Sequence, residues 1–377
     1  MDNFTYYNPV QIYFGEKQVK ALPKLVSNYE NILIIYGMGS IKKNGILEQV
    51  KTELKDKNTF EFSGIGANPR LEQISDVFDL IKKNQIDFLL AIGGGSVIDA
   101  TKFISVATYH PDDPWKILSE RQKIQKNIDF GCVLTLPATG SESNAFSVIS
   151  KGDEKLGFGG DPRLYAKFAI LDPTYTYSLP QKQLANGIVD AYVHVLEQYL
   201  TVHNEAHIQD MYALSVLTVL QDIADDVLNK QEYHSRANFM WAANQALNGL
   251  LGMGQVHDWS THMIGHELTA LYNIDHARTL AIILPAVMEI QKDKKQNKLI
   301  EYGMAIFNEK DIDLIIKKTK QFFDSLNVPT TLKAYNIDRS DFQKIAKQVR
   351  THIPVNIGEH KDIDEAKIIQ ILERAYE

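Results

Sequence analysis

The sequence predicts an α/β nucleotide-binding domain followed by an all-helical domain. In the first half, short apolar runs without polar alternation recur between amphipathic helical stretches, which is typical of a parallel sheet. In the second half, apolar residues recur at helical spacing and almost no strand pattern is found. The length of 377 residues also exceeds what one core usually serves. We therefore expect two domains, residues 1–180 and 181–377, with a proline-containing linker that ends at Pro180.

The composition is that of an ordinary globular protein, with 44% hydrophobic and 23% charged residues. The formal net charge of -7 and the lack of a basic stripe argue against a nucleic-acid or membrane-surface partner. The first residues lack a basic head and a long apolar core, so we expect no signal peptide, and no apolar run approaches the about 18 residues of a membrane span. Cys132 is the only cysteine, which excludes a disulfide within the chain and a thiolate zinc site. A reducing, cytoplasmic location fits best.

The elements of the first domain follow from apolar patterning. Residues 4–14 mix aromatic and β-branched side chains around a proline, which predicts an edge or dimer-forming strand. Further strands are expected at 31–36, 59–62, 86–92, 132–137 and 168–171. Helices are expected at 17–28, 47–55, 71–84 and from 97 onward. The alternation of the two predicts that the strands are parallel.

Glycine-rich loops follow two of these strands. Residues 93–96 read Gly-Gly-Gly-Ser between a buried strand and a helix, where exposed N–H groups and the helix dipole favour a pyrophosphate over the alternative of a purely structural turn. Asp99 would then contact a ribose or amide, or cap the helix. Residues 37–40 read Gly-Met-Gly-Ser, but the third glycine of the dinucleotide fingerprint is missing. This second loop is equally consistent with a simple strand-to-helix turn.

A polar loop at 138–144 follows the strand that ends at Pro137. Several such loops at one sheet edge indicate a dinucleotide cleft, because ligands of open α/β sheets collect at the carboxyl ends of the strands. Lys155 lies in a charge run at 151–155, for which we expect a solvated turn.

The second domain carries a possible metal site. Asp190 and His194 are four residues apart in an apolar helical stretch, so both side chains leave one helix face, and a buried carboxylate needs a cation. His262 and His266 repeat this spacing, and His276 follows ten residues later. Carboxylate and imidazole are ligands expected for zinc or ferrous iron. Spacing alone leaves open whether His262 or His266 is the ligand.

Helices are expected throughout this domain. They cover about 183–200, 205–229, 232–251, 258–271, 278–292, 294–307, 311–326, 339–350 and 362–376. His203 and His207 also lie four apart, but their neighbours are polar and we expect a solvated pair. A nucleotide domain followed by a helical metal domain is expected to place the coenzyme and the metal at a common cleft.

Five stretches carry a family resemblance. They are residues 36–45, 93–99, 136–142, 187–197 and 259–276. In this order the chain resembles the iron-containing (group III) alcohol dehydrogenases, close to their NADPH-dependent butanol dehydrogenase and aldehyde reductase branch. The resemblance implies a dehydroquinate-synthase-like fold, a homodimer, and a metal ion held by Asp190, His194, His262 and His276. It places His266 beside the ligands, facing the substrate.

The resemblance also assigns residues to the coenzyme. NAD-preferring relatives often have an aspartate at the place of Gly39, whereas Gly39 and Ser40 leave room and a donor for a 2′-phosphate, which favours NADPH. Lys42 and Lys43 lie nearby, although they are equally consistent with a solvated helix face. Lys155 matches a family lysine near the coenzyme. The full set of expected coenzyme contacts is Gly37, Gly39, Ser40, Asn68, Gly94, Gly95, Ser96, Asp99, Thr135, Thr139 and Lys155.

These residues imply a metal-dependent, NADP(H)-linked enzyme that interconverts small aliphatic aldehydes and primary alcohols, of the butanal and butanol type. The metal, Fe²⁺ or Zn²⁺, would polarise the substrate oxygen, and zinc has the higher intrinsic affinity. His266 would relay the proton or orient a ligand. The alternatives are an NAD-dependent polyol dehydrogenase, a dehydroquinate-synthase-like lyase and a non-catalytic nucleotide sensor.

The substrate pocket is expected to be small and apolar. Trp259, Leu268, Leu271 and Tyr272 suggest such a lining, although some of them would serve the core. Few basic residues surround the expected ligands, which argues against the lyase, since its substrate is phosphorylated and carboxylated.

Overall fold

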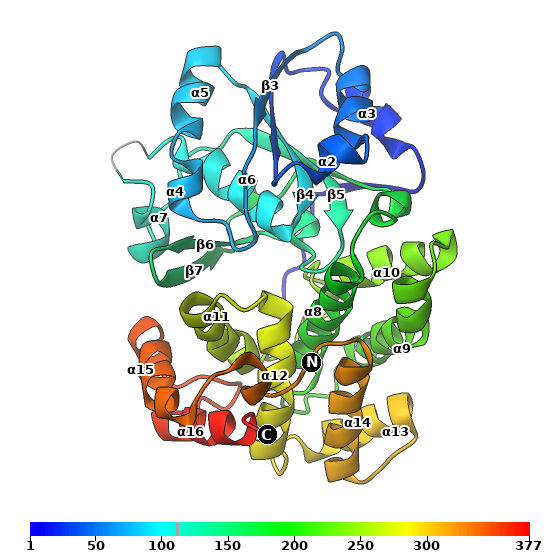
Figure 1. The fold of residues 1–377 in the computed structure, drawn as a ribbon, viewed down its shortest axis with the longest axis vertical. Coiled ribbons are helices and arrows are strands. Elements are labelled where there is room, and N and C mark those ends of the chain that lie inside the picture. The colour runs from blue at the N-terminus through cyan, green and yellow to red at the C-terminus, as the bar shows by residue number, and fades with distance from the viewer. Residues whose placement is uncertain (111–112) are drawn as a thin grey trace. The chain divides into compact units, whose positions relative to one another are not determined.

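The computed structural model describes residues 1–110 and 113–377. They form two compact units (Figure 1). One unit spans Tyr7–Leu179, and the other joins Pro180–Glu377 with the first six residues, Met1–Tyr6.

The first unit is built on a parallel sheet with the strand order β1-β8-β5-β4-β2-β3. All neighbouring strands of this sheet pair in parallel. The strands are β1 (Gln11–Phe14), β2 (Asn31–Tyr36), β3 (Asn58–Phe62), β4 (Phe88–Gly94), β5 (Asp129–Leu136) and β8 (Phe168–Leu171). The central ones are almost wholly buried, as expected for a sheet covered on both faces.

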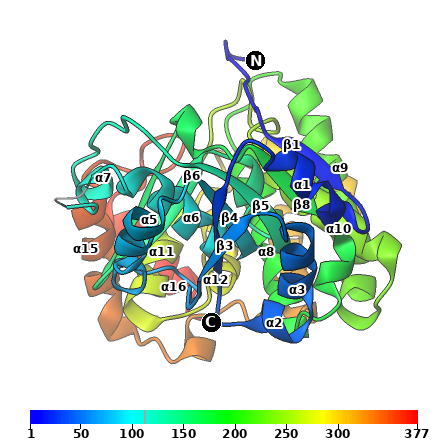
Figure 2. The ribbon, with the colours of Figure 1, turned by 90° about the horizontal axis from the view of Figure 1, so that it is seen from above.

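Short helices cover the sheet. On one face, η1 (Gln18–Ala21), α1 (Leu22–Leu25), α2 (Ser40–Lys43) and α3 (Ile46–Glu53) pack their apolar residues against alternate strand residues. Figure 2 shows α1 and α3 on one side of the sheet and α5 (Val77–Asn84) and α6 (Gly95–Ala107) on the other. The α/β prediction is therefore confirmed.

Several expected elements differ from the observed ones. The strand expected at 4–14 begins only at Gln11, and the helix expected at 17–28 is reduced to η1 and α1. The helix expected at 71–84 is divided into α4 (Leu71–Ile74) and α5. An antiparallel hairpin was missed: β6 (Phe146–Lys151) pairs with β7 (Glu154–Gly159). Its charged residues hid the strand pattern, so Lys155 lies in a strand and the turn expected at 151–155 is confined to the residues between β6 and β7.

The second unit is helical. Its helices are α8 (Gln181–Tyr199), α9 (His207–Asn229), α10 (Tyr233–Ala246), α11 (Ser260–Tyr272), α12 (His276–Ile290), α13 (Gln296–Phe307), α14 (Ile312–Ser325), α15 (Phe342–His352) and α16 (Glu365–Arg374). Each falls where a helical pattern was predicted. Helices α11, α12, α15 and α16 share one apolar core, and an isolated bridge joins Ile357 to Ile363.

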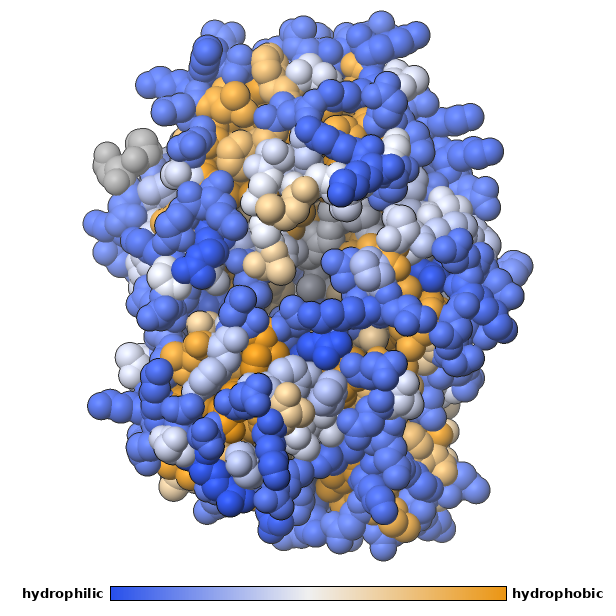
Figure 3. All heavy atoms as spheres, in the orientation of Figure 1, coloured by the Kyte–Doolittle hydropathy of each residue, from blue (hydrophilic) through white to orange (hydrophobic). Residues whose placement is uncertain are grey.

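Hydrophilic side chains dominate the face drawn in Figure 3. Among the described residues, no helix combines the length and the apolar character that a bilayer crossing requires.

Candidate functional site

Helix α8 presents two of the expected metal ligands. Asp190 and His194 lie one turn apart on the same face, each with only 3% of its surface exposed. The Oδ1 atom of Asp190 is 3.8 Å from Nδ1 of His194. Apolar residues on the other faces of α8 are fully buried, which places both polar groups deep inside the unit.

Two further helices bring imidazoles to this pair. His262, in the first turn of α11, has its Nε2 atom 3.0 Å from Nε2 of His194. The ligand atoms of Asp190, His194 and His262 all lie within 4.8 Å of one another. His276 begins α12, and its Nε2 atom is 3.7 Å from Oδ1 of Asp190. The structure thus brings together the four residues named from the sequence.

The chemistry of this cluster suits a divalent cation. Burial, followed by the neighbouring His262, lowers the pKa of His194 well below its usual value, so the ring is neutral at neutral pH. Neutral imidazole is the form that binds metals. One carboxylate with three imidazoles is a donor set for Zn²⁺ or Fe²⁺.

His266 lies beside this cluster. Its ring centroid is 5.2 Å from that of His276 and 6.1 Å from that of His262, and the side chain is half-buried. His203 and His207, which share the four-residue spacing, are both exposed.

In the first unit, the loop at the end of β4 leads directly into α6, which begins at Gly95. A Cβ atom at Gly95 would lie 2.4 Å from Oγ1 of Thr139. Only glycine therefore permits the 138–144 loop to approach the start of this helix. The Thr139 hydroxyl accepts a hydrogen bond from the amide of Ser141 at 3.2 Å, and Thr135 lies buried near the end of β5.

Asp99 does not cap α6, which was one of the two roles expected for it; the N-cap residue is Gly94. Asp99 lies four residues inside α6, so the cap interpretation is wrong. Its Oδ1 accepts from the Ser141 hydroxyl at 2.5 Å and its Oδ2 from the Val148 amide at 3.0 Å. The half-buried carboxylate thus ties α6 to the polar loop and to β6. Burial raises its pKa, and the nearby Lys102 ammonium opposes this shift.

The hairpin places Lys155 against another expected coenzyme residue. The Lys155 ammonium donates to Oδ1 of Asn68 at 3.1 Å. Asn68 has a left-handed backbone conformation, with φ of 54°. These two residues are 87 positions apart in the sequence, and the missed strand β7 is what brings them together.

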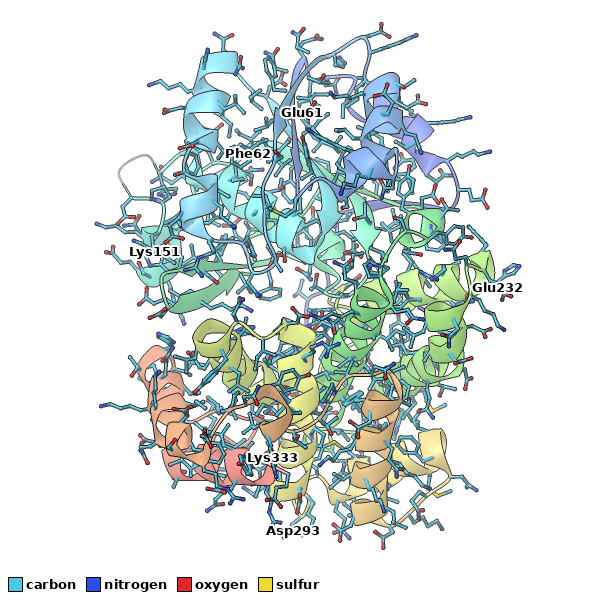
Figure 4. The ribbon with its side chains drawn as sticks, viewed as in Figure 1. Glu61, Phe62, Lys151, Glu232, Asp293 and Lys333 are labelled. Carbon is cyan, nitrogen blue, oxygen red and sulfur yellow. The ribbon has the colours of Figure 1, made fainter. Side chains whose placement is uncertain are left out.

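The loop after β2 is shaped by Gly39, whose φ of 101° is strained for other residues. Ser40 begins α2. The Nζ atom of Lys42 lies 3.5 Å from Oε2 of Glu61 and 5.2 Å from the centroid of the Tyr36 ring. Glu61, labelled on β3 in Figure 4, also accepts from the Tyr36 hydroxyl at 2.6 Å. Lys42 is therefore an ion-pair partner rather than a purely solvated residue, whereas Lys43 is exposed.

Comparison with known proteins gives matches over nearly the whole chain. The model of the iron-containing alcohol dehydrogenases matches residues 9–173, and that of the C-terminal domain of the same family matches residues 184–376. The chain belongs to the iron-containing alcohol dehydrogenase family.

Individual relatives agree with this membership. The NADPH-dependent aldehyde reductase YqhD of Escherichia coli is 44% identical, with 100% of this chain and 99% of the relative aligned. The NADH-dependent butanol dehydrogenase A of Clostridium acetobutylicum is 35% identical over 100% of both chains. A crystal structure of E. coli YqhD superposes with a TM-score of 0.97 at 43% identity, covering 100% of this chain and 99% of that one. The family resemblance inferred from the motifs is confirmed.

In this iron-containing alcohol dehydrogenase family member, three of the four residues named for an apolar pocket serve the core, as was expected for some of them. Leu268 is fully buried in the core shared by α11, α12, α15 and α16, and Leu271 and Tyr272 pack against it. Trp259 instead lies edge-on to His262, with ring centroids 5.3 Å apart. Helical spacing could not distinguish core residues from pocket residues, because residues on one helix face can serve either purpose.

Sequence reasoning missed one polar residue of the cluster. Glu197 lies on α8 less than one turn after His194, is 2% exposed, and its Oε2 atom is within hydrogen-bonding distance of Nδ1 of His262. The signal was present in the sequence as a third polar residue on the Asp190 and His194 face.

Proposed function

We propose that the chain is a metal-dependent, NADP(H)-linked alcohol dehydrogenase and aldehyde reductase that acts on small aliphatic aldehydes and primary alcohols. The observation that carries the proposal is the convergence of Asp190, His194 and His262, whose ligand atoms lie within 4.8 Å of one another in a buried setting. The names of the relatives support the reaction class, since they include an aldehyde reductase and butanol dehydrogenases.

Each residue of the cluster has a role in this proposal. Asp190, His194, His262 and His276 would hold one divalent ion. When bound, the ion and the coenzyme supply Lewis-acid polarisation of a carbonyl group and a hydride. His266 is half-buried beside this set and would deliver or remove the proton, directly or through a water molecule or a ribose hydroxyl.

The same proposal assigns the pyrophosphate to the start of α6, where Gly94, Gly95 and Ser96 present backbone amides. Asn68 and Lys155, which are hydrogen-bonded to each other, would contact the coenzyme from the hairpin side.

The preference for NADPH rests on the loop after β2. Gly39 carries no carboxylate to repel a 2′-phosphate, and the Ser40 hydroxyl and the Lys42 ammonium offer a donor and a charge. The relatives' names do not decide the coenzyme, because one is NADPH-dependent and another NADH-dependent. The expected coenzyme preference is therefore argued from Gly39, Ser40 and Lys42 of this chain.

Consumption of NADPH and NADH with butanal tests the function. The protein is first freed of metal with a chelator and then supplied with Zn²⁺ or Fe²⁺. We expect turnover with NADPH only after metal is restored. Silence with both coenzymes and each ion would contradict the proposal, and metal-dependent oxidation of glycerol with NAD⁺ instead would favour the polyol dehydrogenase.

We also propose a homodimer in a reducing cytoplasm. The strand β1 forms one edge of the sheet, which leaves backbone groups able to pair with another chain, and the sole cysteine, Cys132, is buried. Sedimentation at micromolar concentration tests the dimer, and a monomer mass would contradict it.

A further inference from the structure

Glu197 is a buried carboxylate within the metal-binding cluster of the helical unit. A buried carboxylate is unfavourable unless hydrogen bonds or cations compensate for its lost hydration. Its side chain is only 1% exposed. Hydrogen bonds from α11 therefore stabilise this buried carboxylate, and they include contacts with His262, an expected metal ligand.

Both oxygens of Glu197 bond to the first turn of α11. Oε1 accepts from the backbone amides of Thr261 at 2.7 Å and His262 at 3.3 Å. The first amides of a helix have no partner within the helix, so a carboxylate from α8 caps α11 from outside. The backbone carbonyl of Glu197 also accepts from the Asp258 amide at 3.0 Å, which fixes the chain entering α11.

The second oxygen, Oε2, contacts the His262 ring. An ionised carboxylate can only accept hydrogen bonds, so its contact with Nδ1 requires that Nδ1 carry the proton. In the neutral ring, Nε2 then keeps its lone pair. This is the nitrogen that faces Nε2 of His194 at 3.0 Å.

We propose that Glu197 is a positioning residue that selects the metal-binding tautomer of His262 and holds its ring toward His194. The inference rests on the proposed metal site. It assigns Glu197 no contact with substrate or coenzyme: the residue acts through His262, because one carboxylate fixes both the backbone and the ring of that ligand.

Helix α11, which carries His262, also provides a matched control. Glu267, on α11, is a buried carboxylate like Glu197 of α8, and its Oε1 lies 2.8 Å from Nδ1 of His352 on α15. His352 is not among the residues whose ligand atoms converge on Asp190. The two pairs share chemistry and burial but differ in whether the histidine faces the metal-binding cluster.

The test compares Glu197→Gln with Glu267→Gln. In Glu197→Gln the amide oxygen can still accept from the backbone of α11, whereas the amide nitrogen would face Nδ1 as a second donor. Two facing N–H donors repel each other, so the His262 proton would move from Nδ1 to Nε2. A protonated Nε2 has no lone pair with which to bind the metal. We expect Zn²⁺ and Co²⁺ to bind Glu197→Gln about 10- to 100-fold more weakly, with an altered Co²⁺ absorption spectrum, and Glu267→Gln to bind them as the wild type does.

Metal binding is measured by competition with a chelator, without coenzyme or aldehyde. Wild-type affinity and an unchanged Co²⁺ spectrum in Glu197→Gln would overturn the inference. Because no turnover is involved, an inactive wild-type protein that binds metal normally would contradict only the proposed function.

A second measurement needs no variant. In metal-free wild-type protein labelled with ¹⁵N-histidine, nuclear magnetic resonance distinguishes the two ring nitrogens. We expect His262 to carry its proton on Nδ1 with Nε2 unprotonated. The opposite tautomer in the wild-type protein would overturn the inference even if Glu197→Gln failed to fold.

Discussion

The two units build their candidate sites from different parts of the chain. In the helical unit, side chains on the faces of α8, α11 and α12 converge, and the backbone only holds them in place. In the α/β unit, most of the expected contacts lie at or next to the ends of β2, β4 and β5, where backbone amides and small residues matter most. The first site should therefore depend on the identity of side chains and the second on the space around the backbone.

The largest effect is expected from removing a side chain of the metal-binding cluster. His262→Ala should bind Zn²⁺ more than about 100-fold more weakly and lose about 1000-fold in aldehyde turnover, because the cluster loses a ligand and Glu197 loses the ring that it contacts. Metal content after dialysis and NADPH consumption measure the two effects. His203→Ala is the control, since His203 shares the four-residue spacing but is exposed. Equal losses in both variants would contradict a specific metal site.

A smaller effect should follow from filling space in the α/β unit. A Cβ atom at Gly95 would meet Thr139 at 2.4 Å, so Gly95→Ala should push the loop away, weaken NADPH binding about tenfold or more and cost about 1–3 kcal/mol of stability. Fluorescence titration and thermal unfolding measure these changes. In Gly157→Ala the nearest atom would be Val148 Cγ2, 3.6 Å away, and we expect near-normal behaviour. Normal NADPH binding by Gly95→Ala would place the coenzyme elsewhere.

Coenzyme preference should respond more mildly, because a single exposed charge is involved. Lys42→Ala should reduce kcat/KM for NADPH about tenfold relative to NADH, which corresponds to one charge-assisted contact of about 1.4 kcal/mol. The effect should shrink as salt is added. Lys24→Ala, on α1, serves as the charge-matched control. An unchanged ratio of the two kcat/KM values would remove Lys42 from the 2′-phosphate site.

The smallest effect on activity is expected from a partly exposed charge with a structural role in the helical unit. Burial opposes the ionised form of Asp362, but hydrogen bonds from Lys294 and Lys367 outweigh it and lower the pKa. A carboxyl with a lowered pKa in the folded state stabilises the fold above its unfolded-state pKa of about 3.9, and this stabilisation is lost as pH falls toward the folded-state value. We expect Asp362→Asn to cost about 1–2 kcal/mol at pH 7.

Urea unfolding at pH 7, 5 and 3 measures this difference. It should shrink below about pH 4, where the Asp362 carboxyl of the unfolded wild-type chain takes up a proton while that of the folded chain stays ionised. A difference that stayed constant over this range would show that Asp362 acts through packing instead. Metal affinity should be unchanged in Asp362→Asn, which separates this cluster from the one around Asp190.

Patterning along the chain was sufficient for much of the fold. Buried strands without alternation predicted the parallel sheet, and helical spacing predicted each long helix of the second unit. The same 3.6-residue period placed Asp190 and His194 on one face of α8. These features depend on local geometry and solvent exposure, which the order of residues encodes directly.

Other features depended on contacts between distant residues. The hairpin of β6 and β7 was hidden by its charges, and with it the contact of Lys155 with Asn68. Asp99 could be given a role only when its partners Ser141 and Val148 were known.

By itself, the sequence determined the fold class, the family and the group of residues from which a metal site is built. Only the tertiary structure decided which of these polar groups meet, since spacing on α11 did not distinguish His262 from His266. The contact between the side chains of Glu197 and His262 joins residues that are 65 positions apart in the sequence. The physical reason is that helix periodicity orients a side chain about its own axis, whereas its partner depends on how separate helices pack.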